Sequence, residues 1–339
     1  MRLVMTKKPS GRPSANKKEA LPAMPATMEK MMREFVKIIE GGDETVAKED
    51  LNALMTSLSG PSAYDRLSDK EADAKDEAQQ IAFDAMEAEN EMQARKLAKR
   101  ALKLDPNCVD ALLVMNDLAA RTSREMIEGL QKAVAAGERT LGAEFIKDHK
   151  GRFWLLLETR PYMRALECLG RALRNQGIRC DAIGIYEKML ELNPNDNQGV
   201  RDPLLGLYLE TGDLDGASRL IKKYKSDASA NFAWGRVLER FLAGDCSGAT
   251  KALSKARKAN RHVELYLTAQ KPLPTEPPEM YSSGSEEEAA LCLSYLSGAW
   301  VEHKEATHWL FERFAETGVN VVPGKAVIEK PHAVSKRLQ

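Results

Sequence analysis

Residues 166–194, LECLGRALRNQGIRCDAIGIYEKMLELNP, decide the fold class of this chain. Leucines recur at helical spacing in the first half, and Tyr186 continues an apolar face in the second half, so each half predicts a helix. Gly170 and Ala182 are small residues that allow the two backbones to approach closely. Pro194 closes the unit, because proline ends a helix. The stretch therefore predicts two paired helices.

The spacing L-x2-L-G-x2-L, followed by A-x3-Y-x2-M-x4-P, matches the tetratricopeptide repeat, a unit of about 34 residues built from two antiparallel helices. Weaker copies of the unit lie on both sides of it. They cover residues 81–106, 112–133, 205–224, 234–256 and 293–310. We therefore expect an all-α fold, a tetratricopeptide-repeat-like helical solenoid of about five to six helix pairs over residues 78–316, preceded by a small helical N-terminal segment.

The residues before the solenoid divide into three parts by composition. Residues 1–25 are basic, contain four prolines and lack an apolar period, so we expect a disordered basic tail. Residues 26–60 hold two runs at helical spacing, separated by Gly41 and Gly42, and predict a short helical pair. Residues 61–77 are polar and acidic, and we interpret them as a linker.

Two insertions and a tail depart from the repeat period. Residues 137–161 break the regular spacing, and residues 269–285 contain four prolines, too many for a helix. Ser285 is expected to cap the helix that follows, because serine accepts hydrogen bonds from free backbone N–H groups at a helix start. Residues 317–339 are interpreted as a C-terminal tail.

Composition excludes several classes of protein. The 339 residues include 50 basic and 50 acidic ones, and 43% are apolar, enough for a sizeable core. No stretch approaches about 18 uninterrupted apolar residues, so the sequence predicts no membrane-spanning helix and no membrane partner. The five cysteines lie far apart without a C-x2-C pair, which favours free thiols in a reducing cytoplasm. The neutral balance argues against nucleic acid as a partner of the whole chain but not against a local basic patch.

Catalytic and metal-binding motifs are not found in the sequence. The chain lacks G-x-S-x-G, G-x4-G-K-[ST], H-E-x2-H and G-x-G-x2-G. His303 and His308 are separated by about 140° around a helix, so they do not share a metal-binding face. We therefore expect no catalytic residues, no metal and no cofactor.

The strongest candidate site is an arginine face. Arg164, Arg171 and Arg174 follow at spacings that place them on one side of a helix, and in the register of Gly170 this side lines the inner groove of the repeat. Arginine offers a fixed fork of donors, so the groove is expected to bind an acidic or C-terminal carboxylate segment. The alternative is a solvated face with a Glu167–Arg171 ion pair. The predicted groove residues are Arg160, Arg164, Arg171, Arg174, Asn175 and Arg201.

Three residues flank this face as candidate binding hot spots: Trp154, Tyr162 and Asn197. Tryptophan and tyrosine are typical hot-spot residues when they are exposed in a groove. They can equally anchor the 137–161 insertion onto the solenoid, and the sequence leaves both interpretations open.

Four stretches carry a resemblance to a known family. They are GRFWLLLETRPYMRA (151–165), ELNPNDNQGVR (191–201), HVELYLTAQKPLP (262–274), and GSEEEA (284–289) paired with W…ATHWL (300–310). Residues 78–312 resemble the suppressor-of-tumorigenicity-seven family, most closely its soluble bacterial relatives with tetratricopeptide repeats. The chain departs from the family at Asn260-Arg261-His262, where Asn-Pro-His is expected, and it lacks the membrane segments of the animal members. The resemblance implies a helical repeat fold and no established reaction.

The function predicted from the sequence is a non-enzymatic scaffold or adaptor. It would bind a peptide or protein partner, acidic in character, in a concave groove. Two alternatives stay open. One is an adaptor recruited to nucleic acid through the basic tail, and the other is an enzyme with a pocket near residues 151–201.

Overall fold

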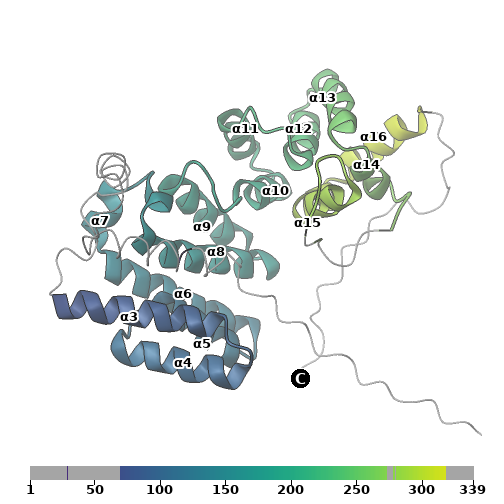
Figure 1. Cartoon of the computed structure of the whole chain (residues 1–339). Coiled ribbons are helices and arrows are strands. Elements are labelled where there is room, and N and C mark those ends of the chain that lie inside the picture. The colour runs from purple at the N-terminus through teal and green to yellow at the C-terminus, as the bar shows by residue number, and fades with distance from the viewer. Residues whose placement is uncertain (1–28, 30–68, 273–277, 279, 318–339) are drawn as a thin grey trace, which may run out of the picture.

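The computed structural model describes residues 29, 69–272, 278 and 280–317, and every regular element within these ranges is helical. Six pairs of helices follow one another along these residues (Figure 1). The pairs are α3 (Asp69–Met86) with α4 (Glu91–Leu104), α5 (Val109–Ala119) with α6 (Ser123–Leu141), α8 (Arg160–Asn175) with α9 (Arg179–Leu192), α10 (Arg201–Thr211) with α11 (Leu214–Lys223), α12 (Ala230–Leu242) with α13 (Cys246–Ala259), and α15 (Glu286–Glu302) with α16 (Lys304–Ala315).

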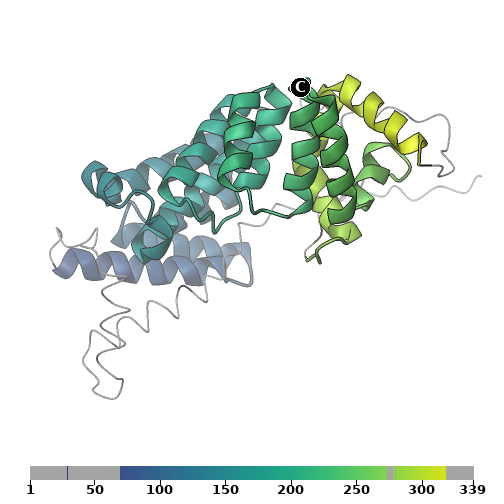
Figure 2. The ribbon, with the colours of Figure 1, turned by 90° about the horizontal axis from the view of Figure 1, so that it is seen from above.

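Short elements connect some of these pairs. They are α7 (Ala143–Asp148), the 3₁₀ turns η1 (Phe153–Leu155) and η2 (Leu157–Thr159), and α14 (His262–Leu267). Each pair packs against the next, so the chain forms a helical solenoid, as the turned view in Figure 2 shows. One apolar cluster joins α3, α4 and the near side of α5, and a second runs without a break from α5 to α16. The predicted all-α solenoid is confirmed.

Local sequence explains where many of these helices begin. Asp213 and Asp245 accept hydrogen bonds at 2.8 Å from the backbone N–H groups of Gly216 and Gly248, and so cap α11 and α13. The Ser285 side chain accepts a hydrogen bond at 3.2 Å from the backbone N–H of Glu288 at the start of α15, which confirms the predicted cap. These caps satisfy N–H groups that have no partner inside the helix.

Gly170 lies where α8 crosses α9. A Cβ atom on Gly170 would be 2.6 Å from the Tyr186 ring, so the ring occupies the space that a side chain at position 170 would need. This is the contact that the repeat spacing predicts, with a small residue on one helix facing an aromatic residue on the other. The pairing of α8 with α9 is therefore set by local spacing.

Gly170→Leu is expected to lower the free energy of unfolding by about 1–3 kcal/mol, because the new side chain must displace Tyr186 from a packed core. Chemical denaturation monitored by circular dichroism at 222 nm, the helical band, measures the change. A variant as stable as the parent would show that Gly170 does not lie at the crossing.

Two predicted boundaries are wrong. Residues 69–77 of the predicted acidic linker belong to α3, because the helix extends toward its N-terminus from the buried Ala78, Ile81 and Ala82. Residues 137–141 of the predicted first insertion belong to α6, since Leu141 is buried at the end of that helix. The tail over 1–25, the rest of the 26–60 and 61–77 segments and residues 318–339 lie outside the described residues, apart from Glu29.

The final pair does not simply follow the fifth one. Helix α15 packs along α10 and also contacts α12 and α14. A Cβ atom on Gly206 of α10 would be 2.2 Å from the backbone oxygen of Tyr295 in α15, so the two backbones touch. His303 Nε2 lies 2.8 Å from the Leu209 carbonyl oxygen. The sixth pair therefore folds back onto the fourth.

Within the described ranges, no helix combines the length and the apolar character that crossing a membrane requires.

Candidate functional site

Arg164, expected in the groove, lies instead in a buried ion cluster. Its Nε donates to Asp110 Oδ1 at 2.9 Å and its Nη2 to Asp110 Oδ2, while Nη1 donates to Glu29 Oε2 at 2.5 Å. Asp110 also accepts a hydrogen bond at 2.6 Å from Gln79 Nε2 of α3. Arg164 is 5% exposed and Asp110 is 0% exposed. The prediction that Arg164 is available to a partner is wrong, because α5 and Glu29 already supply its carboxylates.

The charges in this cluster stabilise each other. Burial by itself would lower the pKa of Arg164, but attraction to Asp110, its hydrogen bonds and the attraction to Glu29 outweigh burial and raise that pKa above its ordinary value. The Arg164 guanidinium carbon also lies 5.8 Å from the centre of the Phe83 ring on α3. Arg164 therefore joins α3, α5 and α8.

Arg174 and Arg201 are also engaged within the fold. The Arg174 guanidinium carbon lies 5.1 Å from the ring centre of Tyr295, so α15 covers this part of the predicted groove. Arg201 Nε donates to Asp227 Oδ2 at 2.8 Å, and the guanidinium stacks on Tyr224 at 5.2 Å. Arg201 therefore does not offer its full set of donors to a partner, which corrects the prediction for Arg201. Arg174 makes the ring contact with Tyr295, and its Nη1 is buried without a hydrogen-bond partner.

Two predicted site residues, Arg160 and Tyr162, make packing and hydrogen-bond contacts around the 137–161 insertion. Arg160 is buried and donates to the Trp154 carbonyl oxygen at 3.3 Å, with its guanidinium carbon 5.2 Å from the Trp154 ring centre. Tyr162 is 1% exposed, packs against Gly137 and donates to Glu138 Oε1 at 3.1 Å. The Tyr162 ring also lies 6.3 Å from the Phe153 ring in η1, which supports the anchoring interpretation, and the prediction of Tyr162 as an exposed hot spot is wrong.

Asn197 is exposed in the loop between α9 and α10. Its neighbour Asp196 organises this loop by accepting hydrogen bonds from the backbone N–H groups of Val200 and Arg201 at 2.8 and 3.0 Å. Asn197 is thus accessible, but it does not line the pocket that contains Arg171.

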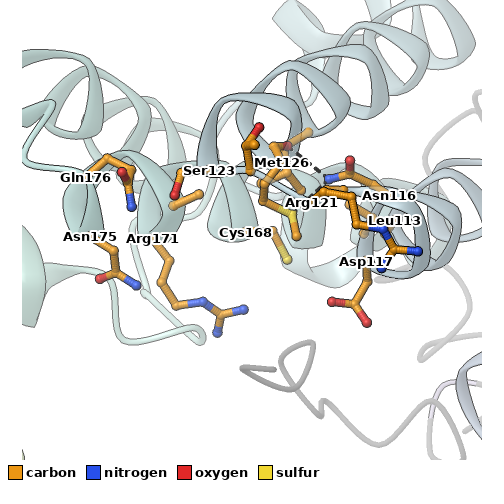
Figure 3. A pocket seen from close by; sticks show the side chains of 14 residues that line it. Leu113, Asn116, Asp117, Arg121, Ser123, Met126, Cys168, Arg171, Asn175 and Gln176 are labelled. Carbon is orange, nitrogen blue, oxygen red and sulfur yellow. Dashed lines mark hydrogen bonds between the residues drawn. The ribbon is translucent and has the colours of Figure 1, made fainter. Parts of the chain in front are cut away.

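Arg171 and Asn175 are the predicted groove residues that line a pocket. This pocket, of about 360 Å³, lies between the end of α5, the start of α6 and the last turns of α8. Figure 3 shows Arg171, Asn175 and Gln176 on one side, with Arg121 on the other. We name it the α5–α8 pocket. Its lining residues are Leu113, Asn116, Asp117, Ala120, Arg121, Thr122, Ser123, Met126, Leu130, Cys168, Arg171, Ala172, Asn175 and Gln176.

The α5–α8 pocket combines an apolar floor with a polar rim. Leu113, Leu130 and Cys168 are buried, and burial raises the pKa of the Cys168 thiol to about 12, so the thiol stays protonated at neutral pH. Arg121 is exposed and Arg171 is half-buried at the rim. An apolar floor with a few charged donors is typical of sites that hold a side chain or a small ligand.

The Arg171 side chain has no hydrogen bond or ion pair with any other residue in the described part of the chain. The Glu167–Arg171 pair of the alternative interpretation is not formed, because the Glu167 carboxylate accepts a hydrogen bond at 2.6 Å from Gln198 Nε2. Burial raises the pKa of Glu167, although this hydrogen bond and the nearby arginines oppose the shift. Arg171 is therefore a half-buried cation whose charge the described fold leaves without a direct partner.

The sequence did not identify Arg121, Asn116 and Ser123 as site residues. They belong to the preceding helix pair, about 50 positions before Arg171, and no local pattern distinguishes them. Asn116 is fixed at the rim because its Nδ2 donates to the Met126 carbonyl oxygen at 2.9 Å. Only the packing of α5 and α6 against α8 brings these side chains to the pocket.

The cavity beside the insertion, between Gly137 and Tyr162, has a volume of about 20 Å³, enough for a single water molecule. Within residues 69–272 and 280–317, no group of three or more His, Cys, Asp or Glu side chains is placed to hold a metal ion.

Comparison with known proteins finds no family model that matches the chain and no curated protein of significantly similar sequence. The resemblance to the suppressor-of-tumorigenicity-seven family therefore stays a prediction.

Proposed function

We propose that this protein is a non-enzymatic interaction module, a scaffold or adaptor of tetratricopeptide-repeat type, that binds a peptide or protein partner through the α5–α8 pocket. A carboxylate of the partner is received by Arg171 and Arg121. The observation that carries the proposal is Arg171, a half-buried cation at a pocket rim without a described ion pair. A guanidinium at a pocket rim without an ion pair in the described fold keeps its fork of donors for a carboxylate of the partner.

A second arginine on the same face of α8 supports a carboxylate as the group that Arg171 binds. Arg164 lies seven positions before Arg171, two helical turns away, and binds two carboxylates at once. Arginine is suited to this because its planar fork matches a carboxylate with two parallel hydrogen bonds. The partner's carboxylate at Arg171 would repeat, between molecules, the contact that Arg164 makes within the chain.

The size of the pocket suits part of a partner rather than a whole domain. About 360 Å³ accommodates one or two side chains of a peptide, with apolar atoms on Leu113 and Leu130 and a carboxylate at the rim. An acidic side chain next to an apolar one, or a C-terminal apolar residue with its free carboxylate, meets both requirements. The partner is therefore expected to be a peptide segment of this composition.

The test compares peptide binding by the parent and by the Arg121→Ala, Arg171→Ala double variant. A library of peptides with acidic residues and free C-termini is selected on the parent, and the affinities of the selected peptides are measured by calorimetry. Each arginine engaged with a carboxylate contributes about 1.5–3 kcal/mol, so affinity is expected to fall at least about tenfold per arginine. The unfolding temperature is expected to hardly move, because both side chains are on the pocket rim.

The matched control is the Arg124→Ala, Arg219→Ala double variant, which removes two exposed arginines outside the pocket. It is expected to bind the selected peptides as the parent does. Peptides that bind the parent and the pocket variant equally would overturn the proposal. Equal losses in both double variants would show only a general effect of charge.

A further inference from the structure

Apart from the basic residues at 1–25, positive charge is concentrated in one part of this neutral chain. Residues 217–261 contain eleven Lys and Arg residues and three acidic residues, an excess of eight positive charges in a chain whose net charge is zero. They span most of α11, all of α12 and all of α13. The overall neutrality therefore conceals a strongly basic region.

The three acidic residues of this region are all engaged in the fold. Asp227 pairs with Arg201 at 2.8 Å, Glu239 lies 3.5 Å from Arg240, and Asp245 both caps α13 and lies 3.3 Å from Arg240. Asp227 and Asp245 also hold backbone N–H groups by hydrogen bonds. None of the three neutralises the lysines of α13.

Helix α13 presents its lysines on one side. Ala249, Leu253 and Ala256 are buried against α12, whereas Lys251, Lys255 and Lys258 are exposed. The lysines follow at spacings of four and three, which places them within about 60° of arc opposite the buried face. Exposed Arg261 follows the helix, and within the described residues none of these four cations has an ion pair. We name Lys251, Lys255, Lys258 and Arg261 the basic stripe; α13 lies at the outer edge of the solenoid in Figure 1.

We infer that the basic stripe binds the phosphate backbone of a double-stranded nucleic acid, without reading its sequence. The three lysines extend over about 10 Å of α13, at 1.5 Å per residue, and Arg261 follows beyond the end of the helix. Duplex DNA carries one negative charge per about 1.7 Å of its axis, so three lysines on one side of α13 face several phosphates. The hydroxyls of Ser247 and Ser254, exposed on α13, add donors of the kind that contact phosphate.

The side chains exposed around the basic stripe favour a nucleic acid duplex over a membrane, a single-stranded nucleic acid or a protein partner. The exposed large hydrophobic residues of the described ranges lie outside α11, α12 and α13. Insertion at a membrane surface needs apolar residues, single-stranded nucleic acid needs aromatic residues for stacking, and protein interfaces use aromatic hot spots. A face of cations and hydroxyls alone matches the backbone of a duplex, where phosphate contacts supply essentially all of the sequence-independent affinity.

Helix α4 provides a matched control for charge. Lys96, Lys99 and Lys103 are exposed and also share one side of their helix. Residues 84–105 around them contain five basic and five acidic residues, so this region is neutral where 217–261 is basic. The two lysine triplets therefore differ in their surroundings and not in their own charge.

The experiment measures binding of fluorescent DNA and RNA duplexes to the full chain by anisotropy, between about 50 and 200 mM salt. The test variant, called the α13 variant, carries three changes: Lys251→Gln, Lys255→Gln and Lys258→Gln. The control, called the α4 variant, also carries three: Lys96→Gln, Lys99→Gln and Lys103→Gln. Glutamine keeps the helix propensity of lysine, so both variants are expected to match the parent in circular dichroism. Affinity at low salt is expected to fall about tenfold or more in the α13 variant, and the slope of log affinity against log salt by about three. The α4 variant is expected to bind as the parent does.

Several results would overturn the inference. They are a parent that binds neither duplex at low salt, an α13 variant that binds as the parent does, and equal losses in the α13 and α4 variants. Preference of the parent for polyglutamate over a duplex would identify an acidic protein partner instead. All proteins in the experiment keep residues 1–25, so binding through that basic tail would persist in the α13 variant and count against the stripe.

Discussion

Arg164→Ala is expected to lower the free energy of unfolding by about 3–5 kcal/mol, because it leaves the Asp110 carboxylate buried without its counter-charge. Asp110 is 0% exposed, and the described partner of its carboxylate besides Arg164 is Gln79. The loss is expected to affect α3, α5 and α8 together, since Arg164 joins these helices. Urea denaturation of the full chain, monitored by circular dichroism, measures the change.

Arg171→Ala is the matched control, because it removes the same side chain from the same helix face at the pocket rim. Its effect on unfolding is expected to stay within about 0.5 kcal/mol. The Arg164→Ala, Asp110→Ala double variant removes both charges and is expected to be more stable than the sum of the two single changes predicts. Equal stability of the Arg164→Ala and Arg171→Ala variants would show that the buried cluster is not a structural element of the fold.

Gly206→Ala is expected to cost at least about 3 kcal/mol, at or above the upper end of the range for overpacked cores. The added Cβ would lie 2.2 Å from the Tyr295 carbonyl oxygen and 3.0 Å from its carbonyl carbon. Because these are backbone atoms of α15, no side chain can rotate away, and the whole helix must move off α10. Limited proteolysis is expected to cleave near α15 sooner than in the parent, and urea denaturation gives the free energy.

Gly184→Ala is the corresponding control. Gly184 lies in α9, and no atom is within 4 Å of a Cβ placed there. Alanine is a better helix former than glycine, so this change is expected to stabilise the protein by about 0.5–1 kcal/mol. If both alanine variants were equally stable, the contact between α10 and α15 would not exist in solution.

Together these variants separate two roles that one helix face combines. Arg164 and Arg171 have the same chemistry and the same orientation on α8, yet one supports the fold and the other is proposed to bind a partner. A triple alanine variant of Arg164, Arg171 and Arg174 would confuse unfolding with loss of binding. The double variant of Arg121 and Arg171 avoids this, because neither side chain takes part in the buried cluster.

The arrangement of helices could be predicted from the sequence because it depends on local spacing. The period of leucines, the small residue at Gly170 and the cap at Ser285 act over a few positions, and the structure contains each of the contacts they predict. The three lysines of the basic stripe also follow a local spacing on α13, whereas their exposure depends on the packing of α13 against α12. Periodicity thus determined which segments are helices and how the central pair packs.

Only the tertiary structure decided which arginines are free to bind. The partners of Arg164 lie 54 and 135 positions away, at Asp110 and Glu29, and Arg174 is covered by Tyr295 of the last helix pair. Helical spacing places side chains on the same face but says nothing about which distant segment covers that face. Burial and counter-charges come from contacts between units far apart in the chain. For this reason the sequence determined the arginine face as a whole, and the packing of α5 and α15 divided it into structural residues and a pocket.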